Sequence, residues 1–164
     1  MPHTKDTLQQ FLNEIDVSTT TIEHPALFTV EDSKALRGEI DGGHTKNLFV
    51  KDKKGKLFLL VVEEDAQIDM KTVNKKLDCG RLSFGKPDLL MEKLGIIPGA
   101  VTAFSIINDS DNAVQIVFDE KLMQHEIINC HPLTNEATTS IARDDLLSFV
   151  KACGHEPLIM ALQD

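Results

Sequence analysis

The strongest structural signal in the sequence is a β-hairpin near the middle of the chain. Residues Asn47–Lys51 and Leu57–Glu63 are rich in apolar and β-branched side chains, and they flank the turn Asp52-Lys53-Lys54-Gly55. The run Leu57–Val62 is also the longest unbroken apolar stretch. Because it is far shorter than the ~20 residues that span a bilayer, the sequence predicts a strand there and no membrane span.

Signals on both sides of the hairpin predict a mixture of helices and strands. Helical spacing with capping or glycine signals predicts helices at 4–15 opening at Thr4, from Thr29 to about Arg37 before Gly38, at Met70–Leu77 after Asp69, at Pro87–Leu94 before Gly95, and at 143–152 before Gly154. Further strands are predicted at Thr19–His24, Val101–Ile107, Ala113–Asp119, Glu126–Asn129, Ala137–Ile141 and Pro157–Leu162. With no linker or repeat, we expect one α+β domain over residues 1–164. Its sheet should be mixed, largely antiparallel, with short surrounding helices.

The composition is that of a globular protein. Hydrophobic residues make up 41% and charged residues 26% of the 164, which argues against a disordered or fibrous chain. The segment Met1–Asp6 has no apolar stretch of the signal-peptide type. Cys79, Cys130 and Cys153 form no CxxC pair, and an odd number of cysteines suits a reducing compartment. We therefore expect a soluble cytoplasmic protein.

Three segments carry residues suited to chemistry. Gly42–Phe49 brings Lys46 and Asn47 to the start of a strand, with glycines that would let the backbone approach another molecule. Gly95–Gly99 can present successive backbone N–H groups to one oxygen, and Asn129–Asn135 contains a histidine suited to hydrogen bonding or acid–base chemistry. Taken singly, each segment also fits a structural role. The other histidines, without such local context, are expected at the surface: His3, His24, His44, His125 and His155.

In this order, Thr45–Phe49, Gly95–Gly99 and His131-Pro132-Leu133 resemble the motifs of the YbaK/prolyl-tRNA-synthetase-associated family. Members of that family are hydrolases that remove a wrong amino acid from tRNA(Pro). The resemblance covers nearly the whole chain, from Phe28 to Ile159. The segments 36–40 and 42–47 resemble most closely the free-standing alanyl-tRNA(Pro) deacylases. The resemblance therefore implies the family's fold and hydrolysis of the ester between an amino acid and the terminal ribose of tRNA.

The same resemblance implies roles for individual residues. Lys46 matches a functionally essential lysine, and the loop Gly95-Ile96-Ile97-Pro98-Gly99 matches the one that holds the aminoacyl end. We expect N–H groups of this loop to polarise the ester carbonyl, Lys46 to bind the terminal adenosine or its phosphate, and Asn47 and His131 to hold ribose hydroxyls. An activated ester needs mainly a positioned water and oxyanion stabilisation, so no cofactor or metal is implied.

The amino acid that we expect to be removed follows from the limited selectivity of a synthetase pocket. A synthetase pocket built for proline cannot strongly exclude alanine, because each missing methylene is worth only ~1–3 kcal/mol. A second site that admits alanine and is too small for proline corrects the error. We expect its apolar wall to come from Ile22, Leu27, Phe28 and Ile106. The expected partner is the acceptor end of tRNA(Pro), edited in trans, with prolyl-tRNA synthetase as a possible second partner.

Three alternatives stay open on the sequence alone. The same fold could edit Cys-, Ser- or Thr-tRNA, which a comparison of deacylation rates would show. The chain could be a non-catalytic tRNA- or synthetase-binding module, which would bind tRNA without turnover. An unrelated small-molecule hydrolase would instead cleave simple amino-acid esters without tRNA.

The charge of the chain is unevenly distributed. The whole sequence has 17 basic and 26 acidic residues, a net charge of −9, yet residues 46–93 hold 11 basic and 8 acidic residues. This net-positive third includes the lysines of the hairpin and Arg81, which is the best candidate for contact with a base edge or the terminal phosphate. We expect weak, salt-sensitive contact with RNA over a small area.

Overall fold

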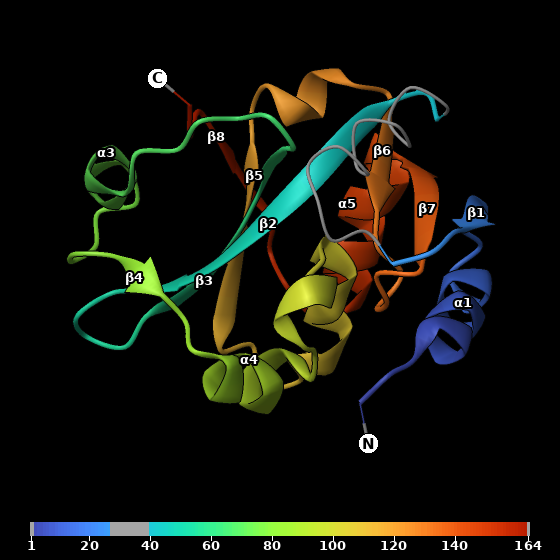
Figure 1. Cartoon of the computed structure of the whole chain (residues 1–164), viewed down its shortest axis with the longest axis horizontal. Coiled ribbons are helices and arrows are strands. Elements are labelled where there is room, and N and C mark those ends of the chain that lie inside the picture. The colour runs from blue at the N-terminus through green and yellow to red at the C-terminus, as the bar shows by residue number, and fades with distance from the viewer. Residues whose placement is uncertain (1, 27–39, 164) are drawn as a thin grey trace.

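A long strand, β2 (Gly43–Lys51), runs through the centre of the computed structural model, which describes residues 2–26 and 40–163 (Figure 1). From Thr45 to Lys51 it pairs antiparallel with β3 (Leu57–Glu63). The predicted hairpin is therefore confirmed, with β2 starting four residues earlier than expected. In its turn, the buried Asp52 carboxylate accepts hydrogen bonds from the N–H groups of Lys54, Lys56 and Gly80.

The sheet is mixed, as predicted. Its strand order is β1 (Thr19–Glu23), β7 (Ala137–Ala142), β6 (Ile127–Cys130), β2, β3, β5 (Val114–Asp119) and β8 (Leu158–Met160), while β4 (Ser83–Phe84) pairs with the end of β2. Strand β6 runs antiparallel to β7 and parallel to β2. Strands β3, β5 and β8 are mutually parallel.

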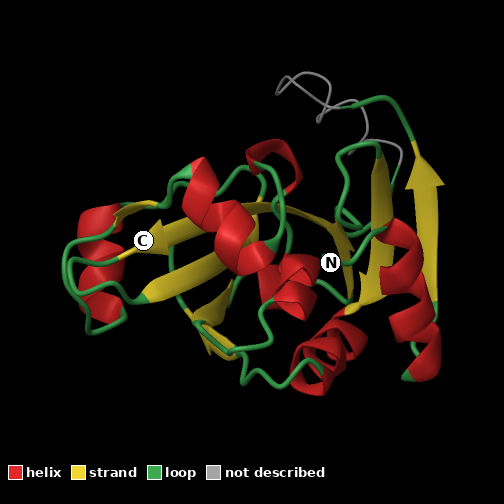
Figure 2. Ribbon diagram, turned by 90° about the horizontal axis from the view of Figure 1, so that it is seen from below, coloured by secondary structure: helices red, strands yellow, loops and turns green. Residues whose placement is uncertain are grey.

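The described helices begin and end at the local signals in the sequence. They are α1 (Lys5–Glu14), α3 (Met70–Lys76), α4 (Pro87–Leu94) and α5 (Arg143–Ala152). Thr4 and Asp69 cap the first two, and Gly95 ends α4 in the left-handed conformation, with φ of 61°. Helices lie at both ends of the molecule and against the middle of the sheet (Figure 2). The predicted helix at Thr29–Arg37 lies outside the described residues.

The predicted strand at Val101–Ile107 is wrong, because this segment forms a short 3-10 helix, Ala103–Asn108. The N–H of Phe104 donates to the Thr102 hydroxyl, and the N–H of Thr102 donates to the Ser105 hydroxyl. This reciprocal capping favours a helical turn. Ala103, Phe104 and Ile106 are all fully buried, so the segment lacks the alternation of a half-buried strand.

Strand β3 is buried on both faces, which divides the apolar core in two. Leu57, Leu59 and Val61 join the cluster that includes residues of α1, α4 and α5. Phe58, Leu60 and Val62 join the cluster beside α3. Neighbouring β2 shares this alternation, with Phe49 on the first side and Val50 on the second. Successive residues of β2 therefore reach different environments, which matters for the polar residues that precede them.

Candidate active site

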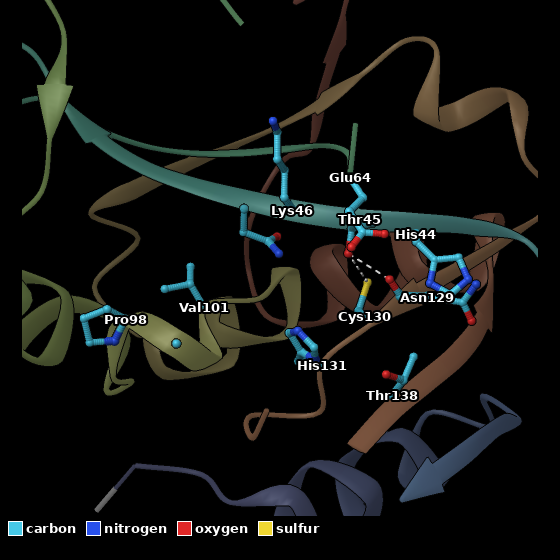
Figure 3. Close-up of a pocket in the computed structure, with 12 residues that line it drawn as sticks. His44, Thr45, Lys46, Glu64, Pro98, Val101, Asn129, Cys130, His131 and Thr138 are labelled. Atoms are coloured by element: carbon cyan, nitrogen blue, oxygen red, sulfur yellow. Dashed lines mark hydrogen bonds between the residues drawn. The ribbon is translucent and has the colours of Figure 1, made fainter. Parts of the chain in front are cut away.

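A pocket opens where β2 separates from β6. The ladder between the two strands ends at His44, while β6 continues to Cys130 in contact with β7. At the point of separation the Thr45 hydroxyl donates to the backbone carbonyl of Asn129 at 2.8 Å. The pocket has a volume of about 240 Å³ and its lining comes from β2, β6, β7 and the segment after α4 (Figure 3): His44, Thr45, Lys46, Asn47, Glu64, Pro98, Gly99, Val101, Asn129, Cys130, His131 and Thr138.

The glycines that precede β2 serve the fold. A Cβ on Gly43 would lie 2.6 Å from the ring of His125, and one on Gly42 would lie 2.7 Å from the carbonyl oxygen of Ile127. The close approach that these glycines permit is to residues of the same chain around β6. Our expectation that they also bring the backbone near another molecule stays a prediction.

The loop Gly95–Gly99 contributes to the pocket through its second half. Pro98 and Gly99 line the pocket, whereas Gly95, Ile96 and Ile97 do not. The N–H of Gly95 donates to the carbonyl of Met91 as the cap of α4. Ile96 is buried in the core and Ile97 is exposed. Because proline has no N–H, Gly99 is the residue of this loop that both lines the pocket and carries a backbone donor.

Lys46 and Asn47 point to opposite sides of β2, as successive strand residues do. The Lys46 ammonium donates to the backbone carbonyl of Ala66, a member of the core cluster beside α3. Figure 3 shows its side chain leaving the strand on the side away from His131 and Cys130. The structure thus places the backbone of Lys46 at the pocket and its charge behind β2.

Asn47 lines the pocket, and its side chain carries a buried acceptor. Its Oδ1 is inaccessible to solvent and has no hydrogen-bond partner among the described residues. A buried carbonyl oxygen without a partner is costly, so this atom is suited to accept from a ligand or a water. Asn129, which also lines the pocket, is different: its amide donates to the carbonyls of Asp41 and Gly43 and accepts from Ser140.

His131 lies at the end of β6 with one ring nitrogen in use. Its Nδ1 lies 3.2 Å from the carbonyl oxygen of Ala137. A carbonyl only accepts, so Nδ1 carries the hydrogen and Nε2 of the neutral ring is an acceptor. Burial lowers the pKa of His131, and the bond to Ala137 and the charge of Glu64 offset this only in part. The neutral ring is therefore favoured at neutral pH, with Nε2 able to accept a proton.

Thr138 is a buried hydroxyl on the β7 wall of the pocket, with a solvent-exposed fraction of 4%. Its hydroxyl oxygen lies 2.8 Å from Nε2 of His24. The other ring nitrogen of His24, Nδ1, lies 2.8 Å from the carbonyl oxygen of Pro25. In the neutral His24 ring, Nδ1 donates to that carbonyl, so Nε2 accepts from Thr138. The donated hydrogen leaves both lone pairs of the Thr138 oxygen unused in this contact.

Cys130 beside His131 looks like a thiol–imidazole pair in sequence but lacks the chemistry of one. Its thiol is fully buried, and burial raises its pKa to about 12. The nucleophile in cysteine catalysis is the thiolate, which is essentially absent here at neutral pH. All three cysteines are free.

Other residues that the sequence singled out lie away from the pocket. Arg81 is exposed and precedes β4, whose Ser83 pairs with Lys51. Lys51 is five residues along β2 from Lys46, a distance of roughly 17 Å in a strand. Of the expected apolar wall, Ile22 and Ile106 do not line the pocket, whereas Leu27 and Phe28 lie outside the described residues. Val101 and Pro98 supply apolar surface instead.

Several pocket residues carried no usable signal in the sequence. Glu64 and Thr138 lie outside the three motif segments, whereas Thr45 and Asn129 each lie within one of them without having been assigned a role. His24 and His44, expected at the surface, are half-buried at or beside the pocket. His155, also expected at the surface, is buried against Asp109. Proximity in sequence was a usable signal for Thr45, next to Lys46, and for Asn129, two residues before His131.

Within residues 2–26 and 40–163, no three His, Cys, Asp or Glu side chains gather closely enough to hold a metal ion. None of the helices in the described ranges has the length and apolar character to cross a bilayer.

Comparison with known proteins gives consistent matches. The sequence model of the aminoacyl-tRNA editing domain matches residues 24–149. The chain is 38% identical to a prolyl-tRNA synthetase associated domain-containing protein 1 of Danio rerio, over 94% of this chain and 85% of that protein. It is 36% identical to the prolyl-tRNA editing protein ProX of Acetoanaerobium sticklandii, over 88% of both chains.

A solved structure described as a candidate trans-editing enzyme for prolyl-tRNA synthetase has the same fold. Its TM-score is 0.74 at 18% identity, with 100% of this chain and 99% of that chain covered. At this identity the likeness concerns the fold, and it agrees with the α+β architecture expected from the sequence.

Proposed function

Because this chain belongs to the aminoacyl-tRNA editing domain family, we propose that it is a hydrolase that removes wrongly attached alanine from tRNA(Pro). It acts in trans, in the cytoplasm, on tRNA released by prolyl-tRNA synthetase. The reaction is hydrolysis of the ester between the amino acid and the terminal ribose. The observation that carries the proposal is the convergence of Asn47, Gly99 and His131, from three distant segments, on one small pocket.

The pocket supports ester hydrolysis by water. Nε2 of His131 is an acceptor that can orient a water and take up its proton as the water attacks the carbonyl carbon. The N–H of Gly99 is the donor that we assign to the developing oxyanion. Oδ1 of Asn47 accepts from a ribose hydroxyl. Cys130 takes no part as a nucleophile because its thiol stays protonated.

The dimensions of the pocket support a small amino acid. Its volume of about 240 Å³ lies below the ~300–1,000 Å³ of typical small-molecule sites. An alanyl group fits such a space between Val101 and the strands, while the adenosine stays at the mouth. Alanine also fits the error of a proline pocket, which cannot exclude a smaller side chain strongly.

Lys46 supports catalysis from behind the pocket. Its ammonium ties β2 to the carbonyl of Ala66, two residues after Glu64 on the pocket wall. We assign Lys46 as a residue that positions β2 relative to the pocket wall at Glu64. Contact with the terminal phosphate would require its flexible side chain to leave Ala66.

Arg81 and the exposed lysines of the hairpin turn, Lys53, Lys54 and Lys56, are assigned to the phosphates of the acceptor stem. They lie roughly 17 Å or more along β2 from the pocket, so they reach nucleotides before the terminal adenosine. A synthetase that remains near its tRNA product is the proposed second partner.

The test is deacylation of Ala-, Ser-, Cys-, Thr- and Pro-tRNA(Pro) by the wild type and by Lys46→Ala, with binding of each tRNA measured in parallel. We expect Ala-tRNA(Pro) to be cleaved fastest, Pro-tRNA(Pro) to be spared, and Lys46→Ala to lose most of the kcat. A loss confined to KM would instead assign Lys46 to the phosphate. Tight binding without cleavage would overturn the proposal in favour of a non-catalytic module.

Arg81→Ala provides a separate test of the docking assignment. We expect KM for tRNA to rise severalfold with kcat retained, and the slope of log affinity against log salt to fall by about one phosphate contact. An unchanged KM at low and high salt would refute the contact.

A further inference from the structure

Phe84 is the most exposed large apolar side chain among the described residues. Its exposed fraction is 63%, and it is the one aromatic side chain in that exposed set. The buried rings of the described chain are those of Phe49, Phe58, Phe104, Phe118 and Phe149. A single exposed apolar residue needs no explanation by itself, so the backbone and the charges around Phe84 decide what it can do.

The backbone that carries Phe84 is held firmly against β2. Phe84 pairs with Val50 in the short ladder between β4 and β2. The next N–H, that of Gly85, donates to the carbonyl of Phe49 at 2.8 Å, and a Cβ on Gly85 would overlap the Phe49 ring. The exposed ring of Phe84 therefore stands on a fixed support, and little backbone freedom is lost when something binds to it.

Cationic side chains surround this support. Arg81 and Lys86 are exposed on either side of β4, and the segment 80–86 contains no acidic residue. The hairpin turn, which the buried Asp52 carboxylate ties to the start of this segment, adds the exposed Lys53. Within the described ranges, none of these three cations forms an ion pair. The surroundings of the ring are therefore complementary to phosphates.

Phe84 lies on the same edge of β2 as the pocket. β3 pairs with the opposite edge, whereas β6 pairs with this edge up to His44 and β4 pairs with it from Val50 (Figure 1). Between Asn47 in the pocket and Val50, β2 advances three residues, roughly 10 Å. Stacked nucleotides of one strand are spaced by about 3.4 Å. The unpaired nucleotides that precede the terminal adenosine of a tRNA therefore span this distance. Paired residues share a face of the sheet, which places Phe84 on the face of β2 that carries Lys46.

An exposed aromatic ring flanked by cations suits a single-stranded base, because every base has a flat π-face and the cations attract its phosphates. We propose that Phe84 stacks on one of the unpaired nucleotides that precede the terminal adenosine, with Arg81 and Lys86 at the adjoining phosphates. The inference rests on the proposed deacylase function, to which it adds a base contact outside the pocket. Stacking tolerates any base, so this contact sets the register of the 3′ end and does not select tRNA(Pro).

The experiment compares deacylation of alanyl-tRNA(Pro) with that of 3′-alanyladenosine, which lacks all preceding nucleotides. Phe84→Leu removes the ring and keeps an apolar side chain, whereas Phe84→Tyr keeps the ring. We expect Phe84→Leu to raise KM for alanyl-tRNA(Pro) about fivefold or more with kcat retained, and Phe84→Tyr to match the wild type. All three proteins should cleave 3′-alanyladenosine equally. Ile159→Ala is the control, because Ile159 is an exposed apolar residue on β8, at the opposite end of the strand order from β1, and its loss should leave KM unchanged.

An abasic nucleotide, placed in turn at each unpaired position before the terminal adenosine, identifies the stacked base. Binding of these uncharged tRNAs is measured with the wild type and with Phe84→Leu. We expect one abasic position to raise the Kd of the wild type about as much as Phe84→Leu does, and to add little in that variant, because two groups in contact are not additive.

The outcomes separate the two proposals. An unchanged KM in Phe84→Leu, or additive effects at every abasic position, would overturn the stacking and leave the deacylase function standing. A loss that Phe84→Tyr shares, or that also appears with 3′-alanyladenosine, would mean that Phe84 acts on the fold or the pocket, which contradicts the inference. If the wild type cleaves no ester, the deacylase function is contradicted, and the abasic tRNAs still decide whether Phe84 stacks on a base.

Discussion

His155 and His131 both contact hydrogen-bond acceptors of the chain, and they differ in how many ring nitrogens take part. Both nitrogens of His155 face acceptors of the chain: Oδ2 of Asp109 at 2.9 Å and the carbonyl of Cys153 at 3.2 Å. Among the described residues His131 has one such partner, the carbonyl of Ala137, and the ring lines the pocket. A fully satisfied buried group stabilises a fold, whereas an open one is completed by a ligand. The comparison distinguishes a structural brace from a site.

The contact between His155 and Asp109, which we call the brace, links two segments of the fold. His155 follows α5, and Asp109 begins the turn before β5, so their contact joins the segment after α5 to the start of β5. The Asp109 carboxylate also accepts from the N–H groups of Ala113 and Val114. Both side chains are almost completely buried. Loss of the carboxylate therefore leaves several buried donors without a partner.

The largest expected effect is on stability at this brace. Asp109→Ala should lower the free energy of unfolding by about 3–5 kcal/mol, because removing one partner of a buried pair leaves the other uncompensated. Urea denaturation followed by circular dichroism measures this loss. Deacylation per folded molecule should stay near the wild-type rate, since Asp109 does not line the pocket.

Asp109→Asn is the companion variant, in case the alanine protein does not fold. It keeps one oxygen acceptor for the backbone and should cost less than the alanine substitution. A loss of catalysis in the folded Asp109→Asn protein, at unchanged stability, would break the distinction between brace and site.

The opposite pattern is expected at His131. His131→Ala should lower kcat at least about 100-fold, the contribution of a positioned general base, while the free energy of unfolding changes by about 1 kcal/mol. Single-turnover deacylation of Ala-tRNA(Pro) measures the chemical step. A variant that keeps its rate, or one that loses stability as Asp109→Ala does, would place His131 among the structural residues.

The contrast also explains which elements were predictable from sequence. Thr4, Asp69, Pro87 and Gly95 act on backbone groups within a few residues, so the helices that they bound could be predicted. The segment from Val101 could not, because its apolar run fits a strand or a buried helical turn equally well. The helical turn forms because Thr102 and Ser105 cap it and because Ala103 is buried.

Within the site, residues in the sequence motifs could be predicted, whereas the residues that contact and position them could not. Residues of the three motifs, Asn47, Gly99 and His131, do reach one pocket, and the family resemblance had joined them. The contact between His24 and Thr138 joins residues 114 positions apart, and no local pattern encodes it. Alternation along a strand places Lys46 and Asn47 on opposite faces of β2, but what Lys46 contacts there depends on the fold of the turn at Ala66.

The smallest expected effect is the pH dependence that separates His131 from the brace. Burial lowers the pKa of His131 in the folded chain below its unfolded value, which is about 6.5. The neutral ring therefore contributes stability that is present in full above the unfolded pKa and is lost as the pH falls from there through the folded pKa. The unfolded chain then binds up to one more proton than the folded chain. The free energy of unfolding therefore changes with pH by at most about 1.4 kcal/mol per pH unit.

Catalysis should fall over the same range, because protonation turns the Nε2 acceptor of His131 into a donor. Urea denaturation of the wild type and His131→Gln between pH 5 and 8 isolates this contribution, which the glutamine variant lacks. Parallel curves for the two proteins would mean that His131 is not held neutral by burial, and with it the general-base assignment would lose its support.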